Sequence, residues 1–196
     1  MSEYIFRDSQ YGRNGIPELT IKDAKILWPH FGGTVNKFTK EIERKFCLIL
    51  DEETADYISK FGVKVRYREP NPNYDNEQEP IPYIDVFVFW RNREGDFVKR
   101  PPEIYMSTRG AKVRTRITEE TAAELDSADI EKLALTIRFR PWEMAGRTGY
   151  KPVLSKLWAI TAPDALDEMY AEFWGDIKDE NKFIDDDEAP DFEDYN

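Results

Sequence analysis

The end of the chain is so acidic that it limits where a packed core can form. Residues 175–196 hold ten Asp or Glu residues and two Lys residues, so they carry about −8 of the formal net charge of −11. Like charges at this density repel one another and favour a disordered interaction tail over a packed element. Residues 1–174 carry only about −3, and the fold must be built from this nearly balanced body.

Composition narrows the class of protein that the body can form. A chain of 196 residues with 40% hydrophobic and 14% aromatic side chains can bury one sizeable core. Cys47 is the sole cysteine, which excludes an intrachain disulfide and fits a reducing compartment. No apolar run approaches the ~20 residues that span a bilayer, and residues 1–13 lack a signal-peptide core. We therefore expect a cytoplasmic protein without membrane contact.

Alternating polar and apolar residues predict a mainly β body. Strands are expected over residues 19–28, 46–50, 63–68, 83–90, 104–106, 111–117, 133–140 and 153–161, and short helices over 51–62, 118–126 and 165–174. The alternation changes phase within residues 19–28, which predicts a bulge in that strand. Residues 1–17 are expected to form an irregular arm, and residues 31–45 and 69–82 to form loops. The pattern indicates a small β-barrel or sandwich with two or three helical inserts over residues 18–174.

Basic and aromatic residues alternate in the second half of the body. Residues 91–116 carry a net charge of about +5 and residues 138–156 about +4. Cations neutralise phosphates and flat rings stack on unpaired bases, so this pattern predicts a groove for single-stranded nucleic acid with little sequence preference. The candidate contacts are Arg91, Arg93, Tyr105, Arg109, Lys112, Arg114, Arg138, Arg140, Trp142, Tyr150, Lys151 and Lys156. Trp142 and Tyr150 are the preferred stacking residues, and Phe139 is expected in the core.

Other interpretations of the same residues remain open. The cations can be solvated outer faces of strands, with the aromatic rings inside. One alternative is a metal-dependent nuclease with Asp23, Asp85 and Glu103 as its acidic cluster. No spacing singles these residues out, and no cofactor is expected. An acidic inhibitor that imitates DNA is a further alternative, but it needs acids spread over a body that instead holds basic stretches. Cys47 lies in an apolar run and is expected to be buried.

Three segments resemble a known family. Residues 20–58, 101–110 and 124–160 are similar to phage-encoded single-stranded-DNA-binding proteins that have an OB fold and an acidic C-terminal tail. The resemblance runs over about residues 18–160 and implies an OB-like barrel, binding of single-stranded DNA in phage replication or recombination, and no enzymatic activity. It also implies that the tail recruits replication or recombination proteins. The tail residues expected to contact such partners, or to compete for the DNA groove, are Asp185, Asp186, Asp187, Glu188, Phe192 and Tyr195. Self-association stays open.

Overall fold

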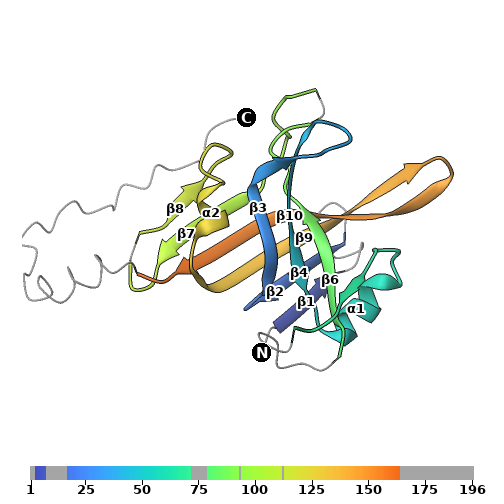
Figure 1. The fold of residues 1–196 in the computed structure, drawn as a ribbon, viewed down its shortest axis with the longest axis horizontal. Coiled ribbons are helices and arrows are strands. Elements are labelled where there is room, and N and C mark those ends of the chain that lie inside the picture. Colours follow the sequence, from blue (N-terminus) through green and yellow to red (C-terminus); the bar gives the residue numbers. More distant parts are fainter. Residues whose placement is uncertain (1–2, 8–16, 72–78, 93, 112, 164–196) are drawn as a thin grey trace, which may run out of the picture. The chain divides into compact units, whose positions relative to one another are not determined.

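The fold is a strongly bent β-structure, seen in a computed structural model that describes residues 3–7, 17–71, 79–92, 94–111 and 113–163 (Figure 1). Its elements lie in one compact unit, Met1–Ala162, and the second unit, Pro163–Asn196, falls outside the described residues except for Pro163. The elements in chain order are β1 (Glu3–Arg7), β2 (Glu18–Lys22), β3 (Ile26–Val35), β4 (Ile42–Ile49), α1 (Glu52–Ser59), β5 (Arg66–Arg68), β6 (Ile81–Phe87), β7 (Glu103–Thr108), β8 (Thr115–Ile117), α2 (Glu124–Ser127), β9 (Ile130–Met144) and β10 (Arg147–Thr161).

The strands form a barrel because the chain itself joins the two ends of the sheet. The paired order is β2-β9-β10-β6-β4-β3, with β10 parallel to β6 and antiparallel to β9. Between β2 and β3 the chain turns from β9 to β4: the Ala24 amide donates to the Leu133 carbonyl (2.7 Å), and the Ile49 amide donates to the Lys25 carbonyl (3.0 Å). If β2 and β3 are counted as one bent first strand, the sheet has five strands. With β4, β6, β9 and β10 as the second to fifth strands, this is the OB arrangement. The predicted OB-like fold class is confirmed.

The core consists of the inward side chains of every barrel strand. Leu133, Leu135, Ile137 and Phe139 of β9 are all at least 96% buried, and the alternate residues of that strand are more exposed. Each fully buried large apolar side chain contributes roughly 1.5–3 kcal/mol relative to exposure. The expected core position of Phe139 is confirmed.

Hydrogen bonds accepted by two aspartate side chains fix the start of α1 and the position of α2 on the barrel. The Asp51 carboxylate accepts a hydrogen bond from the Thr54 amide at 2.6 Å and begins α1, as its sequence predicted. Asp126 of α2 accepts hydrogen bonds from two β3 amides, Phe31 (2.6 Å) and Gly32 (2.9 Å). A side chain at Gly32 would bring its Cβ within 2.8 Å of Ala123 Cβ, so glycine allows α2 to pack this closely. None of the described helices has the length and apolar character to cross a membrane.

Several predicted boundaries were wrong, chiefly in the first third of the chain. The expected irregular arm includes β1, which pairs antiparallel with β2 from Glu3 to Arg7. The phase change within residues 19–28 marks two strands, not a bulge in one, because Asp23 takes a positive φ of 52° between them. Residues 31–45, expected as a loop, mostly extend β3 and β4 into a hairpin with register shifts. These pairings depend on partner strands, which local patterns do not show. The expected helix over residues 165–174 lies outside the described residues.

A tight hairpin joins β9 and β10, which extend past the expected strand ends at residues 140 and 153. Met144 pairs with Arg147, and the two residues between them, Ala145 and Gly146, have φ values of +50° and +74°. Positive φ at both central residues matches the right-handed twist of the flanking strands, which keeps a two-residue turn in register. The ladder continues from there to Thr161, so β9 and β10 form a ribbon that projects from the barrel (Figure 1).

Candidate nucleic-acid interface

Outward-facing side chains near the β9–β10 hairpin form a surface that we call the hairpin face: Phe87, Phe89, Arg140, Trp142 and Lys151. Arg140 lies directly opposite Lys151 in the antiparallel pairing, so both side chains leave the same side of the sheet. The Lys151 ammonium lies 3.8 Å from the centroid of the Phe87 ring and 4.9 Å from that of Phe89. The hairpin face thus combines residues from two separate stretches of the chain, 87–89 and 140–151.

The two phenylalanine rings provide an ordered aromatic base to this surface. Their planes are within 4° of parallel, with centroids 6.0 Å apart, and both rings are half-buried. A cation over the face of such rings gains roughly 0.5–2 kcal/mol, depending on its exposure to water. Lys151 is therefore held against two flat rings, which places a cation next to an aromatic surface.

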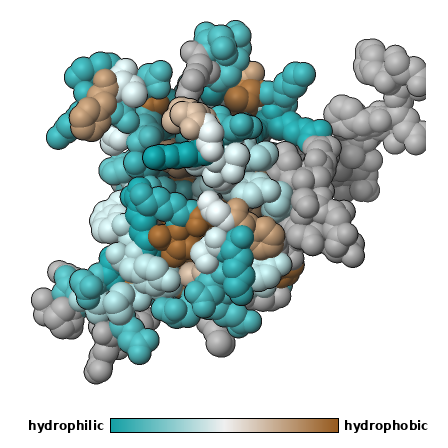
Figure 2. All heavy atoms as spheres, turned by 90° about the vertical axis from the view of Figure 1, so that its right-hand side faces the viewer, coloured by the Kyte–Doolittle hydropathy of each residue, from teal (hydrophilic) through white to brown (hydrophobic). Residues whose placement is uncertain are grey.

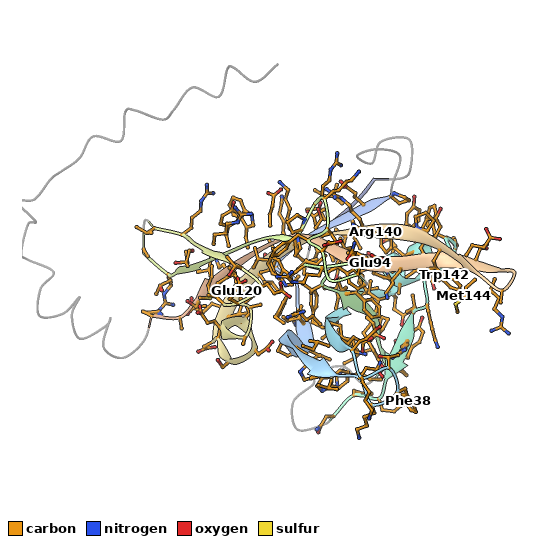
Figure 3. All side chains as sticks on the ribbon, turned by 90° about the horizontal axis from the view of Figure 1, so that it is seen from above. Phe38, Glu94, Glu120, Arg140, Trp142 and Met144 are labelled. Carbon is orange, nitrogen blue, oxygen red and sulfur yellow. The ribbon has the colours of Figure 1, made fainter. Side chains whose placement is uncertain are left out.

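Trp142 extends the hairpin face toward the tip of the ribbon, where Figure 3 shows Arg140, Trp142 and Met144 in succession. Its side chain is 42% exposed. Gly149 lies opposite Trp142 in the ladder, and a Cβ at that position would be only 3.0 Å from the indole. The indole therefore lies against the glycine backbone, and glycine makes room for it. The predicted shared face of Arg138, Arg140 and Trp142 follows from the strand alternation of β9.

The loop between β3 and β4 is a second exposed projection. Phe38 at its tip is 95% exposed, and Val35 and Ile42 at its base are 63% and 60% exposed. The Asn36 side chain accepts a hydrogen bond from the Phe38 amide at 2.9 Å, which fixes the turn that presents the ring (Figure 3). Figure 2 faces this side of the molecule and shows apolar side chains as small separate patches within a hydrophilic surface.

Four of the candidate cations already have carboxylate partners. Arg138 pairs with Glu18 at 2.8 Å, and both side chains are only 14% exposed. The other pairs are Arg91 with Glu119 (2.7 Å), Arg109 with Glu131 (2.8 Å) and Lys156 with Glu103 (3.1 Å). Arg44 also reaches Glu119, at 3.1 Å. A phosphate must compete with these carboxylates, so these four cations are less available than the sequence indicated. Among the described residues, neither Arg140 nor Arg114 has a carboxylate partner.

Three further candidates lie away from the hairpin face. Tyr105 and Arg114 form a separate cluster with Trp158, in which the Arg114 guanidinium is 4.9 Å from the Tyr105 ring centroid. Tyr150, expected to stack on bases, is half-buried and packs against the barrel core. Adjacent residues of a strand point to opposite faces, so Tyr150 does not share the outward face of Lys151. Arg93, Lys112 and the six tail candidates lie outside the described residues.

Sequence reasoning missed the exposure of Trp158, whose side chain is 53% exposed. The β9–β10 register shifts between Leu154 and Lys156, so the residues after this bulge change face. Leu154 is buried, whereas Lys156 and Trp158 point outward. Strict alternation of side chains along the strand expected over residues 153–161 places all three on one face. A bulge can be detected only from the partner strand, although the polar Lys156 within an apolar run was a local signal.

A shared carboxylate lies beside the hairpin face on β6. Asp85 forms an ion pair with Arg66 (3.1 Å) and accepts a hydrogen bond from the Cys47 thiol (3.3 Å). Burial and, to a smaller extent, the hydrogen bond to Asp85 raise the pKa of Cys47 to about 12. The thiol is therefore protonated at neutral pH, and the expected burial of Cys47 is confirmed. On the neighbouring strand, the hydrogen bond to Glu43 raises the pKa of Lys45, which stays positively charged.

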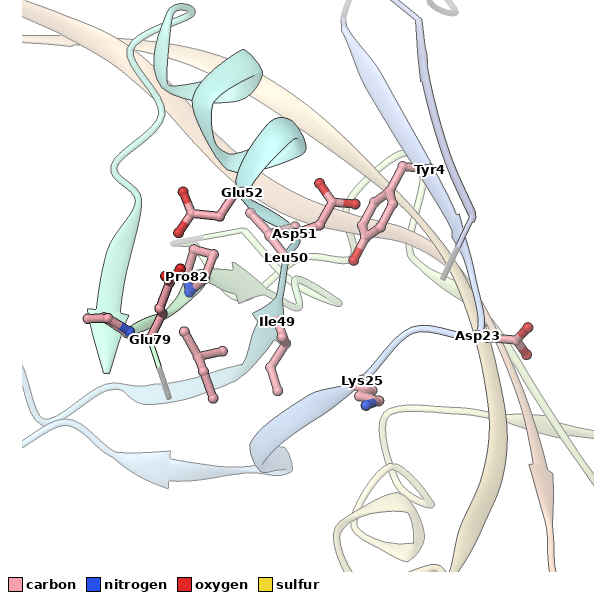
Figure 4. A pocket seen from close by; sticks show the side chains of 11 residues that line it. Tyr4, Asp23, Lys25, Ile49, Leu50, Asp51, Glu52, Glu79 and Pro82 are labelled. Carbon is pink, nitrogen blue, oxygen red and sulfur yellow. The ribbon is translucent and has the colours of Figure 1, made fainter. Parts of the chain in front are cut away.

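An acidic pocket of about 440 Å³ lies elsewhere, between β1, the start of α1 and the start of β6 (Figure 4). Its lining includes the carboxylates of Asp23, Asp51, Glu52 and Glu79 against one cation, Lys25. Four carboxylates repel a phosphate backbone, so this pocket is a poor site for nucleic acid. Nowhere in the described part of the chain do three His, Cys, Asp or Glu residues gather as metal ligands, and Asp85 and Glu103 are held in ion pairs.

A barrel of this topology is an architecture that binds oligonucleotides or oligosaccharides. Comparison with known families is more specific: residues 8–196 match the model of a putative phage ssDNA-binding domain. The chain belongs to this family of phage single-stranded-DNA-binding domains, which confirms the resemblance read from the sequence.

Solved structures with a similar chain path also come from bacteriophages. The single-stranded-DNA-binding protein of bacteriophage Enc34 in complex with ssDNA has 12% identity and a TM-score of 0.45, covering 75% of this chain and 88% of that chain. The gp2.5 single-stranded-DNA-binding protein of bacteriophage T7 has 12% identity and a TM-score of 0.33, covering 84% of this chain and 99% of that chain. No curated protein matches the sequence.

Proposed function

We propose that this protein binds single-stranded DNA with little sequence preference during phage DNA replication or recombination, through the hairpin face. One observation carries the proposal. OB barrels bind oligonucleotides at their second and third strands and at the loops between strands 1 and 2 and strands 4 and 5. In this barrel those parts are β4, β6, the β3–β4 loop and the β9–β10 hairpin, and they carry Phe38, Phe87, Trp142 and Lys151.

The chemistry of this surface fits a single strand. Arg140 and Lys151 neutralise phosphates, and the exposed face of Trp142 stacks on an unpaired base. Stacking on an aromatic ring contributes roughly 1–3 kcal/mol per base and accepts any base, because every base has a flat π-face. Base pairs in a duplex keep their faces covered by their neighbours, so duplex DNA is expected to bind more weakly.

The remaining candidate contacts contribute less in this proposal. Arg91, Arg109, Arg138 and Lys156 each hold a carboxylate, which a phosphate would have to displace. Such an exchange trades one ion pair for another and adds little affinity.

The test is a binding titration by fluorescence anisotropy with labelled oligo(dT), the corresponding duplex and RNA. We expect the full chain to prefer oligo(dT), and Lys151→Ala combined with Trp142→Ala to weaken binding by at least about tenfold. Lys25→Ala is the matched control, because Lys25 is an exposed cation at the acidic pocket and should leave affinity unchanged. Equal losses in the control and the double variant would overturn the assignment. Cleavage of the strand with Mg²⁺ present would overturn the binding-only role.

We also propose that the acidic tail competes with DNA for the hairpin face and recruits replication or recombination proteins in the host cytoplasm. Its charge of about −8 is opposite to that of Arg140 and Lys151 on the hairpin face, and its apolar residues, such as Phe192, add contact area for a partner. Deleting residues 175–196 should raise the affinity for oligo(dT) at low salt, and the gain should shrink as salt screens the tail. An unchanged affinity would remove the competition from the account.

A further inference from the structure

A second aromatic cluster lies on β7 and β10, on strands added to the barrel. Tyr105 and Trp158 are directly opposite each other in the parallel β7–β10 pairing, with ring centroids 6.0 Å apart and planes at 71°. The Arg114 guanidinium lies over both rings, at 4.9 Å and 5.7 Å from their centroids. Arg116 is opposite Tyr105 on β8 and points out of the same face. Two rings and two arginines therefore converge outside the hairpin face.

Tyr105, Trp158 and Arg114 border a pocket of about 490 Å³, which we call the ribbon pocket. Its size is that of a small-molecule site. Its apolar wall includes Ala134 and Ile160, and its charged residues are Lys22, Lys132 and Arg114 against one acid, Asp23. A nucleotide site needs a flat aromatic surface and an apolar wall for the base, and an excess of cations for the phosphate. The ribbon pocket has all three features.

The ribbon pocket is on the same outward surface as the hairpin face. Lys151 and Trp158 both point outward on β10, and seven residues of strand separate them by about 23 Å. Along this path β10 changes its neighbour from β6 to β7, at the bulge between Leu154 and Lys156. The bulge returns Trp158 to the outward face. The carboxylates on the path, Glu18 and Glu103, are both neutralised by ion pairs, so they offer little repulsion to a phosphate backbone.

We propose that the ribbon pocket holds a nucleotide of the same DNA strand, beyond the end of the hairpin face. The base packs against Trp158 and Tyr105, and Arg114 and Lys132 contact its phosphates. This inference rests on the proposed function, since it extends the path of the bound strand. It gives the protein two aromatic contact points joined by the β10 strand, so a longer oligonucleotide gains affinity that a short one cannot reach.

The experiment compares two lengths of oligo(dT), chosen within the range of roughly 4–16 nucleotides that one OB fold covers, so that only the longer reaches both sites. Trp158→Ala and Lys132→Ala should each lower affinity for the long oligonucleotide, Trp158→Ala by on the order of tenfold. Both should leave affinity for the short one unchanged. Trp158→Phe keeps a flat ring and should retain most of the long-strand affinity, and Lys132→Ala alters an exposed side chain that does not support the core. Lys25→Ala serves again as the cation control.

Each outcome separates this inference from the proposed function. If the full chain binds neither length, the proposed function fails. If hairpin-face variants weaken both lengths while Trp158→Ala and Lys132→Ala weaken neither, only the ribbon pocket is overturned. If the ribbon-pocket variants raise the affinity for DNA, and do so only when residues 175–196 are present, the pocket holds an acidic peptide segment and the nucleotide assignment is overturned.

Discussion

Arg138 and Arg140 are two residues apart on the same outward face of β9, yet their surroundings differ completely. Arg138 is opposite Glu18 and forms an ion pair in which both side chains are 14% exposed. Arg140 is opposite Lys151, is exposed, and has no carboxylate partner among the described residues. In the middle of the β9–β10 ribbon, Arg138 forms an ion pair that holds β2, whereas nearer the hairpin Arg140 is exposed to solvent. The count of basic residues in a strand therefore overestimates the charge available to a ligand.

The largest effect expected from this comparison concerns stability. Arg138→Ala leaves Glu18 without its partner in a mostly buried position, and we expect it to lower the free energy of unfolding by about 2 kcal/mol. Arg140→Ala removes an exposed side chain and should change that free energy by less than about 0.5 kcal/mol. Urea unfolding monitored by tryptophan fluorescence measures both. Equal destabilisation by the two substitutions would contradict the division between a structural and an available cation.

The next effect concerns DNA affinity at the hairpin end. Trp142→Ala removes the exposed ring but no core contact, so it should cost about 1–3 kcal/mol of binding to oligo(dT) and little stability. Trp142→Phe keeps a flat ring and should recover most of the loss. A binding titration beside the unfolding curve separates the two properties. A Trp142→Ala variant that binds normally would remove this ring from the interface.

The sequence predicts features that depend on neighbouring residues, but it does not predict contacts between segments that are far apart in the chain. The inward row of β9 follows a strict alternation, so Phe139 was placed in the core from local pattern alone. Glu18 and Arg138 are 120 positions apart, and nothing in either segment indicates that they pair. The same limit explains β1, which is defined by its pairing with β2, and Trp158, whose face depends on a bulge opposite β9. Arg138, Arg140 and Lys156 were correctly placed in strands, but the carboxylate partners of Arg138 and Lys156 were not visible in the local sequence.

A prediction confined to alkaline pH concerns the buried Cys47 thiol, which donates to Asp85 beside the hairpin face. Burial and the contact with Asp85 raise the pKa of Cys47 from 9.0 to about 12. The fold thus favours the protonated thiol, and this contribution is complete below about pH 9 and is lost as the pH rises toward 12. The free energy of unfolding should fall in that window by up to about 1.4 kcal/mol per pH unit more than in Cys47→Ala. Identical pH slopes in the two proteins would contradict the buried thiol–carboxylate contact.

The salt dependence of DNA binding tests the central claim most directly. Each phosphate contact on a single strand contributes about −0.7 to the slope of log affinity against log salt concentration. The account predicts that Arg140→Ala combined with Lys151→Ala makes this slope shallower by about 1.4, the value for two contacts, whereas Lys25→Ala leaves it unchanged. A double variant with the slope of the unaltered protein would contradict the claim that the hairpin end supplies the cations that bind single-stranded DNA.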